Sequence, residues 1–192
     1  LERIGKIFAD SEEILGTEST ERYRNKAQYP VAEQNGKAVC GFYSKRSHRL
    51  TAFEDCLLQP EIFGKIAGCI IDYINENKIT AYNEETGKGL LRHIYIRRGE
   101  HTGEIMVCLV VTNFKKCGKL YGVAGVLVKK FSDIVSIILN ENGKNTNVIM
   151  GKKFSLLYGK EYITDIMCGN KVKISANSFY QVNTIQAERL YS

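Results

Sequence analysis

The 192-residue chain has no apolar run close to the ~18–20 residues that a membrane-spanning helix needs. Its most apolar stretch, residues 123–139, is interrupted by two lysines and an aspartate. The first fifteen residues carry charges throughout and do not resemble a signal peptide. A membrane or secreted protein is therefore not indicated. The 44% hydrophobic and 25% charged residues are ordinary for a soluble globular domain.

Several frameworks for metal binding and catalysis are also missing. None of the six cysteines form a CxxC pair, and their spacing fits neither a dense disulfide scaffold nor a zinc site. We expect most of them to be reduced, buried and unreactive, in a cytoplasmic protein. The three histidines have no carboxylate or cysteine at metal-ligand spacing. There is no Gly-rich phosphate loop, no HExxH pattern and no legible Ser-His-Asp arrangement.

The local patterns that are present predict a β-hairpin followed by a helix. Residues 22–44 fit two strands around Asn35-Gly36, which is a strong hairpin turn signal, and Pro30 suits an edge strand or a bulge. Residues 50–53 fit a short strand or a loop. Pro60 suits the first turn of a helix. The apolar residues of that helix form one stripe, made of Ile62, Ile66, Cys69, Ile70, Tyr73 and Ile74.

A second hairpin-plus-helix unit follows a polar loop over residues 80–88. Residues 90–112 fit a hairpin that turns at Gly99 to Gly103, and residues 115–133 are a helix candidate. A buried strand is expected at 134–139, ended by Asn142-Gly143, with short strands within 154–175. Consecutive hairpins favour an α+β fold with a mostly antiparallel sheet built from two hairpin-plus-helix units. The units, near 22–78 and 90–130, repeat in shape only.

Both ends of the chain have unusual features. Residues 1–20 fit a short helix and a polar loop. The last seventeen residues, ANSFYQVNTIQAERLYS, start a helix that Asn183 or Thr184 could cap, and the chain stops within two turns. It also begins with Leu instead of Met. We expect a piece cut from a longer protein; the alternative is a protein with trimmed or disordered ends.

Basic residues gather in three groups with aromatic neighbours, and the formal net charge is +6. Cations that neutralise phosphates and rings that stack on bases suit single-stranded or looped RNA. A solvated basic face is the equally weighted alternative. The groups are Tyr23, Arg24 and Lys26; Phe42, Tyr43, Lys45, Arg46, His48 and Arg49; and Arg92, His93, Tyr95, Arg97 and Arg98.

Five stretches taken together resemble one family, the SAM-dependent RNA (uracil-5-)-methyltransferases, and above all its 23S ribosomal RNA branch. In chain order they are YRNKAQYPV, GFYSKRSHRL, CLLQP, GLLRHIYIRRGEHTGEIMVCLVV and SFYQVN. The resemblance implies 23S ribosomal RNA and SAM as partners, and neither DNA nor a membrane. It implies that residues 1–176 are a central, RNA-positioning domain. Residues 177–192 would be the truncated start of a Rossmann-like, SAM-dependent methyltransferase domain.

The resemblance also implies roles for single residues. Gln181 matches a glutamine that contacts SAM, a task that suits an amide because it both donates and accepts hydrogen bonds. Phe179 matches an aromatic beside the flipped target base; the alternative is a core anchor at the join between domains. The motif positions of Arg24, Lys26, Arg46 and His48 are read as facing RNA or lying next to a cluster.

Cys56 matches the isolated fourth cysteine of a [4Fe–4S] cluster. The other three ligands would precede Leu1, so this chain alone is not expected to hold the cluster, which needs four thiolates. The transfer-RNA branch of the family typically lacks this cysteine, which favours ribosomal RNA. An ordinary buried cysteine is the alternative.

The resemblance places the catalytic groups outside the chain. In the family a cysteine adds to uracil, which makes C5 nucleophilic toward the methyl group of SAM, and a glutamate is the expected base. Both groups and the SAM loop would lie beyond Ser192. We therefore expect the parent to be an enzyme and this chain alone to be inactive. A stand-alone RNA-binding module and a transfer-RNA uracil methyltransferase stay open as alternatives.

Overall fold

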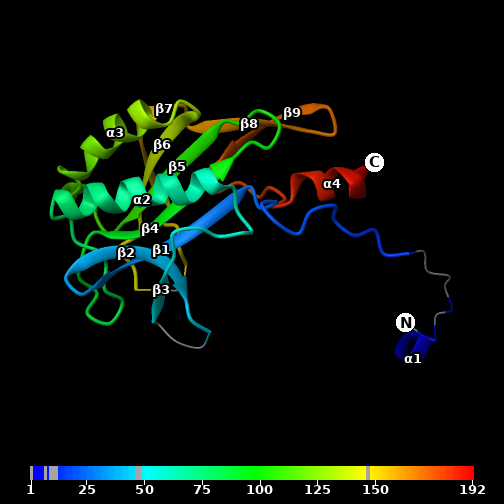
Figure 1. Cartoon of the computed structure of the whole chain (residues 1–192), viewed down its shortest axis with the longest axis horizontal. Helices are drawn as coiled ribbons and strands as arrows, with labels where there is room; N and C mark the ends of the chain where they lie inside the picture. Colours follow the sequence, from blue (N-terminus) through cyan, green and yellow to red (C-terminus); the bar gives the residue numbers. More distant parts are fainter. Residues whose placement is uncertain (1, 7, 9–12, 46–48, 146–147) are drawn as a thin grey trace.

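The structure is a computed structural model that describes residues 2–6, 8, 13–45, 49–145 and 148–192. Seven described strands form one sheet with the order β3-β2-β1-β4-β5-β6-β7 (Figure 1). Neighbouring strands are antiparallel except β5 and β6, so the predicted α+β fold with a mostly antiparallel sheet is confirmed. The strands are β1 (Lys26–Gln34), β2 (Lys37–Tyr43), β3 (Leu50–Ala52), β4 (Leu91–Arg98), β5 (Ile105–Val111), β6 (Ile134–Glu141) and β7 (Lys153–Gly159).

Two hairpins make up the centre of this sheet. The β1–β2 hairpin turns at Asn35 and Gly36, whose φ angles of 52° and 76° are those of a two-residue turn with both residues left-handed. The β4–β5 hairpin turns between Arg98 and Ile105, as predicted. β1 pairs with β4, so the hairpins lie back to back. The predicted repeat of shape is therefore present in the sheet.

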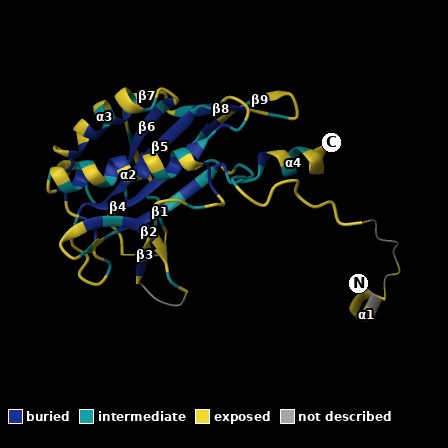
Figure 2. Ribbon diagram, in the orientation of Figure 1, coloured by how far each residue is buried: buried dark blue, intermediate teal, exposed yellow. Residues whose placement is uncertain are grey.

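Two helices cover one face of the sheet (Figure 1). Helix α2 (Glu61–Glu76) begins directly after Pro60, as predicted, and lies beside α3 (Val123–Lys130). Figure 2 shows buried strands under helices whose outer surfaces are exposed. The buried stripe of α2 consists of Phe63, Ile66, Ala67, Cys69, Ile70 and Ile74, whereas Ile62 and Tyr73 are only partly buried.

A small hairpin covers part of the opposite face. It consists of β8 (Tyr162–Met167) and β9 (Asn170–Ser175) and contributes Ile163 and Ile174 to a second core. Because successive strand residues point to opposite faces, Tyr95 belongs to this core while its neighbours in β4 belong to the first. Helix α4 (Thr184–Tyr191) follows, and the side chain of Asn183 caps it, as predicted.

Two local expectations are corrected, and that of a short N-terminal helix is confirmed. Pro30 is not in an edge strand, because β1 lies inside the sheet; its missing N–H falls where β1 changes partner from β4 to β2. The helix expected over 115–133 starts only at Val123, after two short 3-10 turns at Phe114–Lys116 and Leu120–Gly122. The N-terminal helix α1 is a single turn, Glu2–Gly5.

The cysteines largely follow the prediction. Cys40, Cys69, Cys108 and Cys117 are buried and free, whereas Cys56 is half-buried and Cys168 is exposed. In the part of the chain that the structure describes, no helix has the length and apolarity needed to cross a membrane. The domain division after residue 176 stays a prediction.

Candidate nucleic-acid interface

Three of the predicted site residues, Arg24, Lys26 and Cys56, line one cavity of about 200 Å³ at the start of β1. Its remaining lining residues are Gln28, Phe42, Leu58 and Gln59. The segment before α2 closes the cavity against β1, because the Arg24 amide donates to the Leu58 carbonyl over 2.9 Å. The structure thus brings together residues that are 32 positions apart in the sequence.

An arginine–aspartate pair fixes the wall of this cavity. Both terminal nitrogens of Arg22 donate to the two carboxylate oxygens of Asp55 over 2.7 Å. Nη1 of Arg22 also donates to the carbonyls of Cys56 and Gln59, over 2.9 Å each. The guanidinium of Arg22 is therefore engaged in hydrogen bonds within the protein. The cationic side chains that line the cavity are those of Arg24 and Lys26.

Among the described residues that line the cavity, none is a carboxylate that could balance the positive charge. Burial lowers the pKa of Lys26, and the charges of Arg97, its partner across the β1–β4 ladder, and of Arg24 lower it further. The Nε of Arg24 is buried and has no hydrogen-bond partner among the described residues. A bound anion such as a phosphate would balance the positive charge of Arg24 and Lys26.

Cys56 is the residue that the sequence predicts to ligate an iron–sulfur cluster in the complete protein. It is the single cysteine among the residues that line the cavity. Within the described ranges, no group of three or more His, Cys, Asp or Glu is arranged to hold a metal. A [4Fe–4S] cluster needs four thiolates. The described residues of this chain therefore do not fit a cluster by themselves.

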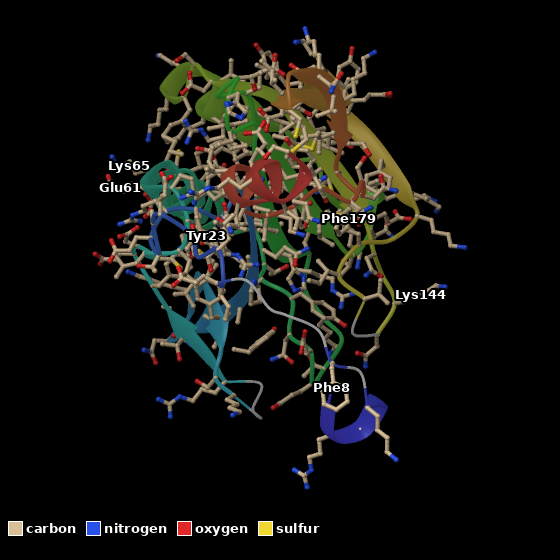
Figure 3. The ribbon with its side chains drawn as sticks, turned by 90° about the vertical axis from the view of Figure 1, so that its right-hand side faces the viewer. Phe8, Tyr23, Glu61, Lys65, Lys144 and Phe179 are labelled. Atoms are coloured by element: carbon tan, nitrogen blue, oxygen red, sulfur yellow. The ribbon has the colours of Figure 1, made fainter. Side chains whose placement is uncertain are left out.

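The two residues predicted to meet the base and SAM lie on the loop between β9 and α4. Phe179 is 86% exposed, so it is not a core residue of this chain (Figure 3). Gln181 is half-buried, and its Nε2 donates to the Tyr191 hydroxyl over 3.0 Å. A single amide side chain does not define a SAM site.

Two buried charged side chains hold this loop in place. Arg97 is 3% exposed and donates to the carbonyls of Ser175 and Ser178 over 2.6 and 2.7 Å. Asp165 is fully buried and accepts the Tyr180 hydroxyl over 2.8 Å, in addition to two backbone amides of the β4–β5 turn. Burial, followed by this hydrogen bond, raises the pKa of Tyr180. The backbone around Phe179 is therefore fixed while its ring faces outward.

Asn25 joins the loop to the cavity. It is 3% exposed and lies between Arg24 and Lys26 in the sequence. Its Nδ2 donates to the Gln181 carbonyl over 2.7 Å and to the Thr184 hydroxyl over 2.8 Å. Its backbone N–H donates to the Val182 carbonyl over 2.9 Å. The two groups of predicted site residues thus form one connected surface region.

The third basic group has a structural role instead. Arg92 is buried, donates to the carbonyls of Asn142 and Lys144 over 2.8 and 2.6 Å, and lies 4.4 Å from the centre of the Tyr82 ring. Burial lowers the pKa of His93 to about 4. Because Arg92, His93, Tyr95 and Arg97 are buried, these four residues do not form an RNA-facing or a solvated surface; Arg98 is half-buried. Arg46 and His48 of the second group lie outside the described residues.

Sequence relatives of this chain are named as RNA methyltransferases. No family model matches the chain. It is 44% identical over 180 residues to an uncharacterized RNA methyltransferase of Streptococcus pyogenes, covering 94% of this chain and 39% of that protein. Proteins of the same description from Lactococcus lactis and Clostridium tetani are 46% and 40% identical, over 90% and 99% of this chain. The chain spans about two-fifths of the length of these relatives.

A solved structure shares the fold. The crystal structure of a Pyrococcus abyssi tRNA (uracil-54, C5)-methyltransferase in complex with S-adenosyl-L-homocysteine superposes with a TM-score of 0.76. The match covers 93% of this chain and 41% of that one, at 23% identity. The predicted resemblance is therefore confirmed: the chain is related in sequence to RNA methyltransferases and shares the fold of a segment of one.

Proposed function

From this relatedness, we propose that the chain is the central segment of a SAM-dependent RNA (uracil-5-)-methyltransferase that works in the cytoplasm, and that it positions the RNA. The observation that carries the proposal is the link through Asn25. It connects a cavity with unbalanced positive charge to a fixed loop that presents Phe179 to solvent. Phosphate binding at one place and base stacking at the other are the two contacts that a single RNA strand offers.

The residues of this chain have separate tasks in this proposal. Arg24 and Lys26 hold phosphates of the RNA backbone, and Phe179 stacks on the target uracil. Gln181 contacts SAM, which supplies the methyl group when it is bound. In the complete protein we expect a cysteine to add at C6 of the uracil, C5 to take the methyl group, and a base to remove the C5 proton before the cysteine leaves.

We propose 23S ribosomal RNA as the substrate, because Cys56 stands at the position of a cluster ligand in the ribosomal branch. The cluster would be held by the complete protein. A transfer RNA is the runner-up, favoured by the shared fold with a protein named as a tRNA methyltransferase. A stand-alone RNA-binding module without catalysis is the second candidate function. It is supported by the cavity that Arg24 and Lys26 line, which suits a phosphate without requiring any chemistry.

The test of RNA positioning is the salt dependence of binding to a 23S ribosomal hairpin, with a transfer RNA as competitor. Each phosphate contact contributes about 0.7–0.9 to the slope of log affinity against log salt. Arg24→Ala and Lys26→Ala should each lower the slope by about one unit. Lys65→Ala is the matched control, because Lys65 is an exposed cation on α2 that pairs with Glu61 (Figure 3). A flat salt response of the unchanged chain would refute RNA positioning.

Catalysis needs a separate test. We propose that this chain alone, with SAM and ribosomal RNA, transfers no methyl group to uridine. Mass spectrometry of the digested RNA measures the product. Detection of 5-methyluridine above a no-protein control would show that the chain has a nucleophile of its own, and the placement of the catalytic groups would then be wrong.

A further inference from the structure

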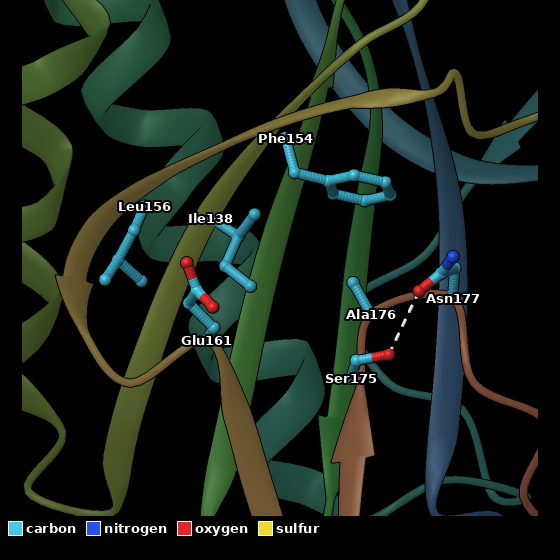
Figure 4. Close-up of a pocket in the computed structure, with 7 residues that line it drawn as sticks. All are labelled: Ile138, Phe154, Leu156, Glu161, Ser175, Ala176 and Asn177. Atoms are coloured by element: carbon cyan, nitrogen blue, oxygen red, sulfur yellow. Dashed lines mark hydrogen bonds between the residues drawn. The ribbon is translucent and has the colours of Figure 1, made fainter.

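A second cavity, of about 220 Å³, lies on the sheet face that the β8–β9 hairpin partly covers (Figure 4). Its floor includes Ile138 of β6 and Ala176, which belong to the smaller core. Phe154 and Leu156 of β7 form one side, and the end of β9 forms the other. Its lining residues are Ile138, Phe154, Leu156, Glu161, Ser175, Ala176 and Asn177.

The side chains around this cavity combine an aromatic ring with exposed polar groups that have hydrogen-bonding capacity to offer a ligand. Phe154 is 39% exposed. Asn177 Oδ1 accepts from the Ser175 hydroxyl over 3.0 Å, and Asn177 Nδ2 has no hydrogen-bond partner in the described ranges. Glu161 likewise forms no hydrogen bond or ion pair with a described residue. The cavity therefore presents a ring face, a free acceptor pair and a free donor.

We propose that this cavity binds one base of a single-stranded RNA, and that guanine is the base it prefers. This inference rests on the proposed function, since it concerns the same RNA. Guanine carries N–H donors on one edge, which the carboxylate of Glu161 accepts, and the O6 and N7 acceptors on another, to which Asn177 Nδ2 donates. Phe154 stacks on the ring, as exposed aromatics do in single-strand binding sites.

Size and position agree with this occupant. Pockets for drug-sized ligands have about 300–1,000 Å³, so the smaller cavity suits a single ring system instead of a whole nucleotide. Asn177 lines the cavity, and Phe179 is two residues further on, so their Cα atoms are at most ~7 Å apart. One strand can therefore reach both. Arg97, bonded to the carbonyls of Ser175 and Ser178, fixes the backbone between them.

The experiment measures the binding of short oligouridylates with the intact chain by fluorescence anisotropy. One oligonucleotide has a central guanosine, a second has inosine there, and a third has uridine throughout. We expect the guanosine to improve affinity by about 5- to 100-fold over uridine, the range for a two-bond base contact. Inosine lacks the 2-amino group and should lose part of that gain.

Two variants and a control locate the effect. Glu161→Gln keeps only one acceptor oxygen and should therefore lower the ratio of guanosine-strand affinity to inosine-strand affinity, a ratio that cancels the general effect of the lost charge. Phe154→Leu keeps an apolar side chain in β7 and should weaken binding of the guanosine strand by about fivefold or more, the lower end of base stacking. Tyr158→Leu is the matched control, because Tyr158 lies in β7 with a similar exposure of 41% but does not line the cavity.

The outcomes separate this inference from the proposed function. If binding depends on salt and on Lys26 but shows no guanosine preference, RNA positioning stands and the base site is overturned. Equal losses in Phe154→Leu and Tyr158→Leu would also overturn it, because they would indicate a general surface effect. If no oligonucleotide or hairpin binds at any salt concentration, both proposals fail.

Discussion

Asn25 is the residue through which the cationic cavity and the Phe179 loop are connected, and Asn25→Asp changes it with almost no change in shape. The amide group that donates to the Gln181 carbonyl over 2.7 Å becomes a carboxylate oxygen. An ionised carboxylate would place two acceptors against each other in a site that is 3% exposed. The Thr184 hydroxyl can turn and donate instead, but the Gln181 carbonyl cannot.

We expect a large loss of stability for Asn25→Asp at neutral pH. An unsatisfied buried polar group costs about 1–3 kcal/mol, and more when it is charged, so a loss of about 3 kcal/mol is the expected size. For a domain of this length each kcal/mol lowers the melting temperature by about 2–4 °C, which gives a shift of about 6–12 °C. Thermal and urea unfolding, both followed by circular dichroism, measure this loss.

The pH dependence is the specific signature of the contact. Burial and the facing carbonyl raise the folded-state pKa of the new aspartate above its unfolded value, because a protonated carboxyl can donate to the Gln181 carbonyl. The folded state then binds the proton more tightly than the unfolded state. Relative to the original chain, Asn25→Asp should therefore regain stability as the pH falls from 8 through the raised pKa toward about 4. Asn25→Ala should lose stability without this recovery.

A matched control comes from the β8–β9 turn. Asn170 Nδ2 also donates to a backbone carbonyl, that of Cys168, over 3.1 Å, but the residue is exposed. Asn170→Asp should change the unfolding free energy by no more than about 0.5 kcal/mol, because water solvates the new charge. If Asn25→Asp behaves like Asn170→Asp, or if it does not recover at acid pH, the link between cavity and loop does not exist as described.

Three further predictions follow from other buried groups. Arg97→Lys should destabilise the chain by about 2 kcal/mol and weaken RNA binding through Phe179, because a single ammonium group replaces a guanidinium that reaches both the Ser175 and the Ser178 carbonyl. Arg98→Lys, a substitution of the half-buried neighbour, is the control and should have neither effect. Because burial lowers the pKa of His93 to about 4, the free energy of unfolding should decrease by up to about 3 kcal/mol as the pH falls from ~6.5 toward 4. In His93→Gln this decrease should be absent when unfolding is measured as a function of pH. An alkylating reagent should modify Cys168 and Cys56 in the folded chain and spare the buried cysteines, as read by mass spectrometry. Burial raises the pKa of Cys40 and Cys117 to about 11 and that of Cys108 to about 12, so these thiols react slowly. Rapid labelling of Cys108 would contradict its buried position.

The hairpins could be predicted because their turns are specified locally. Asn35 and Gly36 adopt the two left-handed conformations that this dipeptide favours. Cys168 and Gly169 adopt similar conformations, with φ angles of 49° and 77°, at the turn between β8 and β9. In both cases the residues of the turn and the alternation of the flanking strands carry the information. No distant contact is needed to predict either one.

The late start of α3 could not be predicted, because a tertiary contact determines it. A Cβ atom at Gly122 would come 2.3 Å from the Tyr73 hydroxyl, so the backbone passes close to α2 at that point. Before it, the Asn113 side chain accepts from the Lys115 amide over 2.8 Å and starts a 3-10 turn. The apolar pattern of 115–133 continues through these residues. The pattern alone contains no information about the close approach to another helix.

The site shows the same limit. Basic and aromatic residues close together in the sequence indicated three groups that face either RNA or solvent, yet Arg92 and Arg97 are buried against backbone carbonyls. A sequence does not say which arginines are used inside the protein. The sequence did not indicate a role for Asn25 or Asp165. All but one of their side-chain hydrogen bonds join residues that are 64 to 159 positions apart, and local patterns do not contain such information.

These long-range bonds also determine where Phe179 and Gln181 lie in this chain. The positions of Phe179 and Gln181 depend on contacts that Arg97, Asp165 and Asn25 make from three different strands or strand ends. All three residues are buried, so their geometry is set by the core of the sheet and not by solvent. Because Asn25 and Arg97 of β4 are both bonded to the loop segment, a small displacement of β1 relative to β4 would strain both sets of bonds. Phosphate binding and base positioning would therefore change together, and variants of Asn25 should impair both by a similar factor.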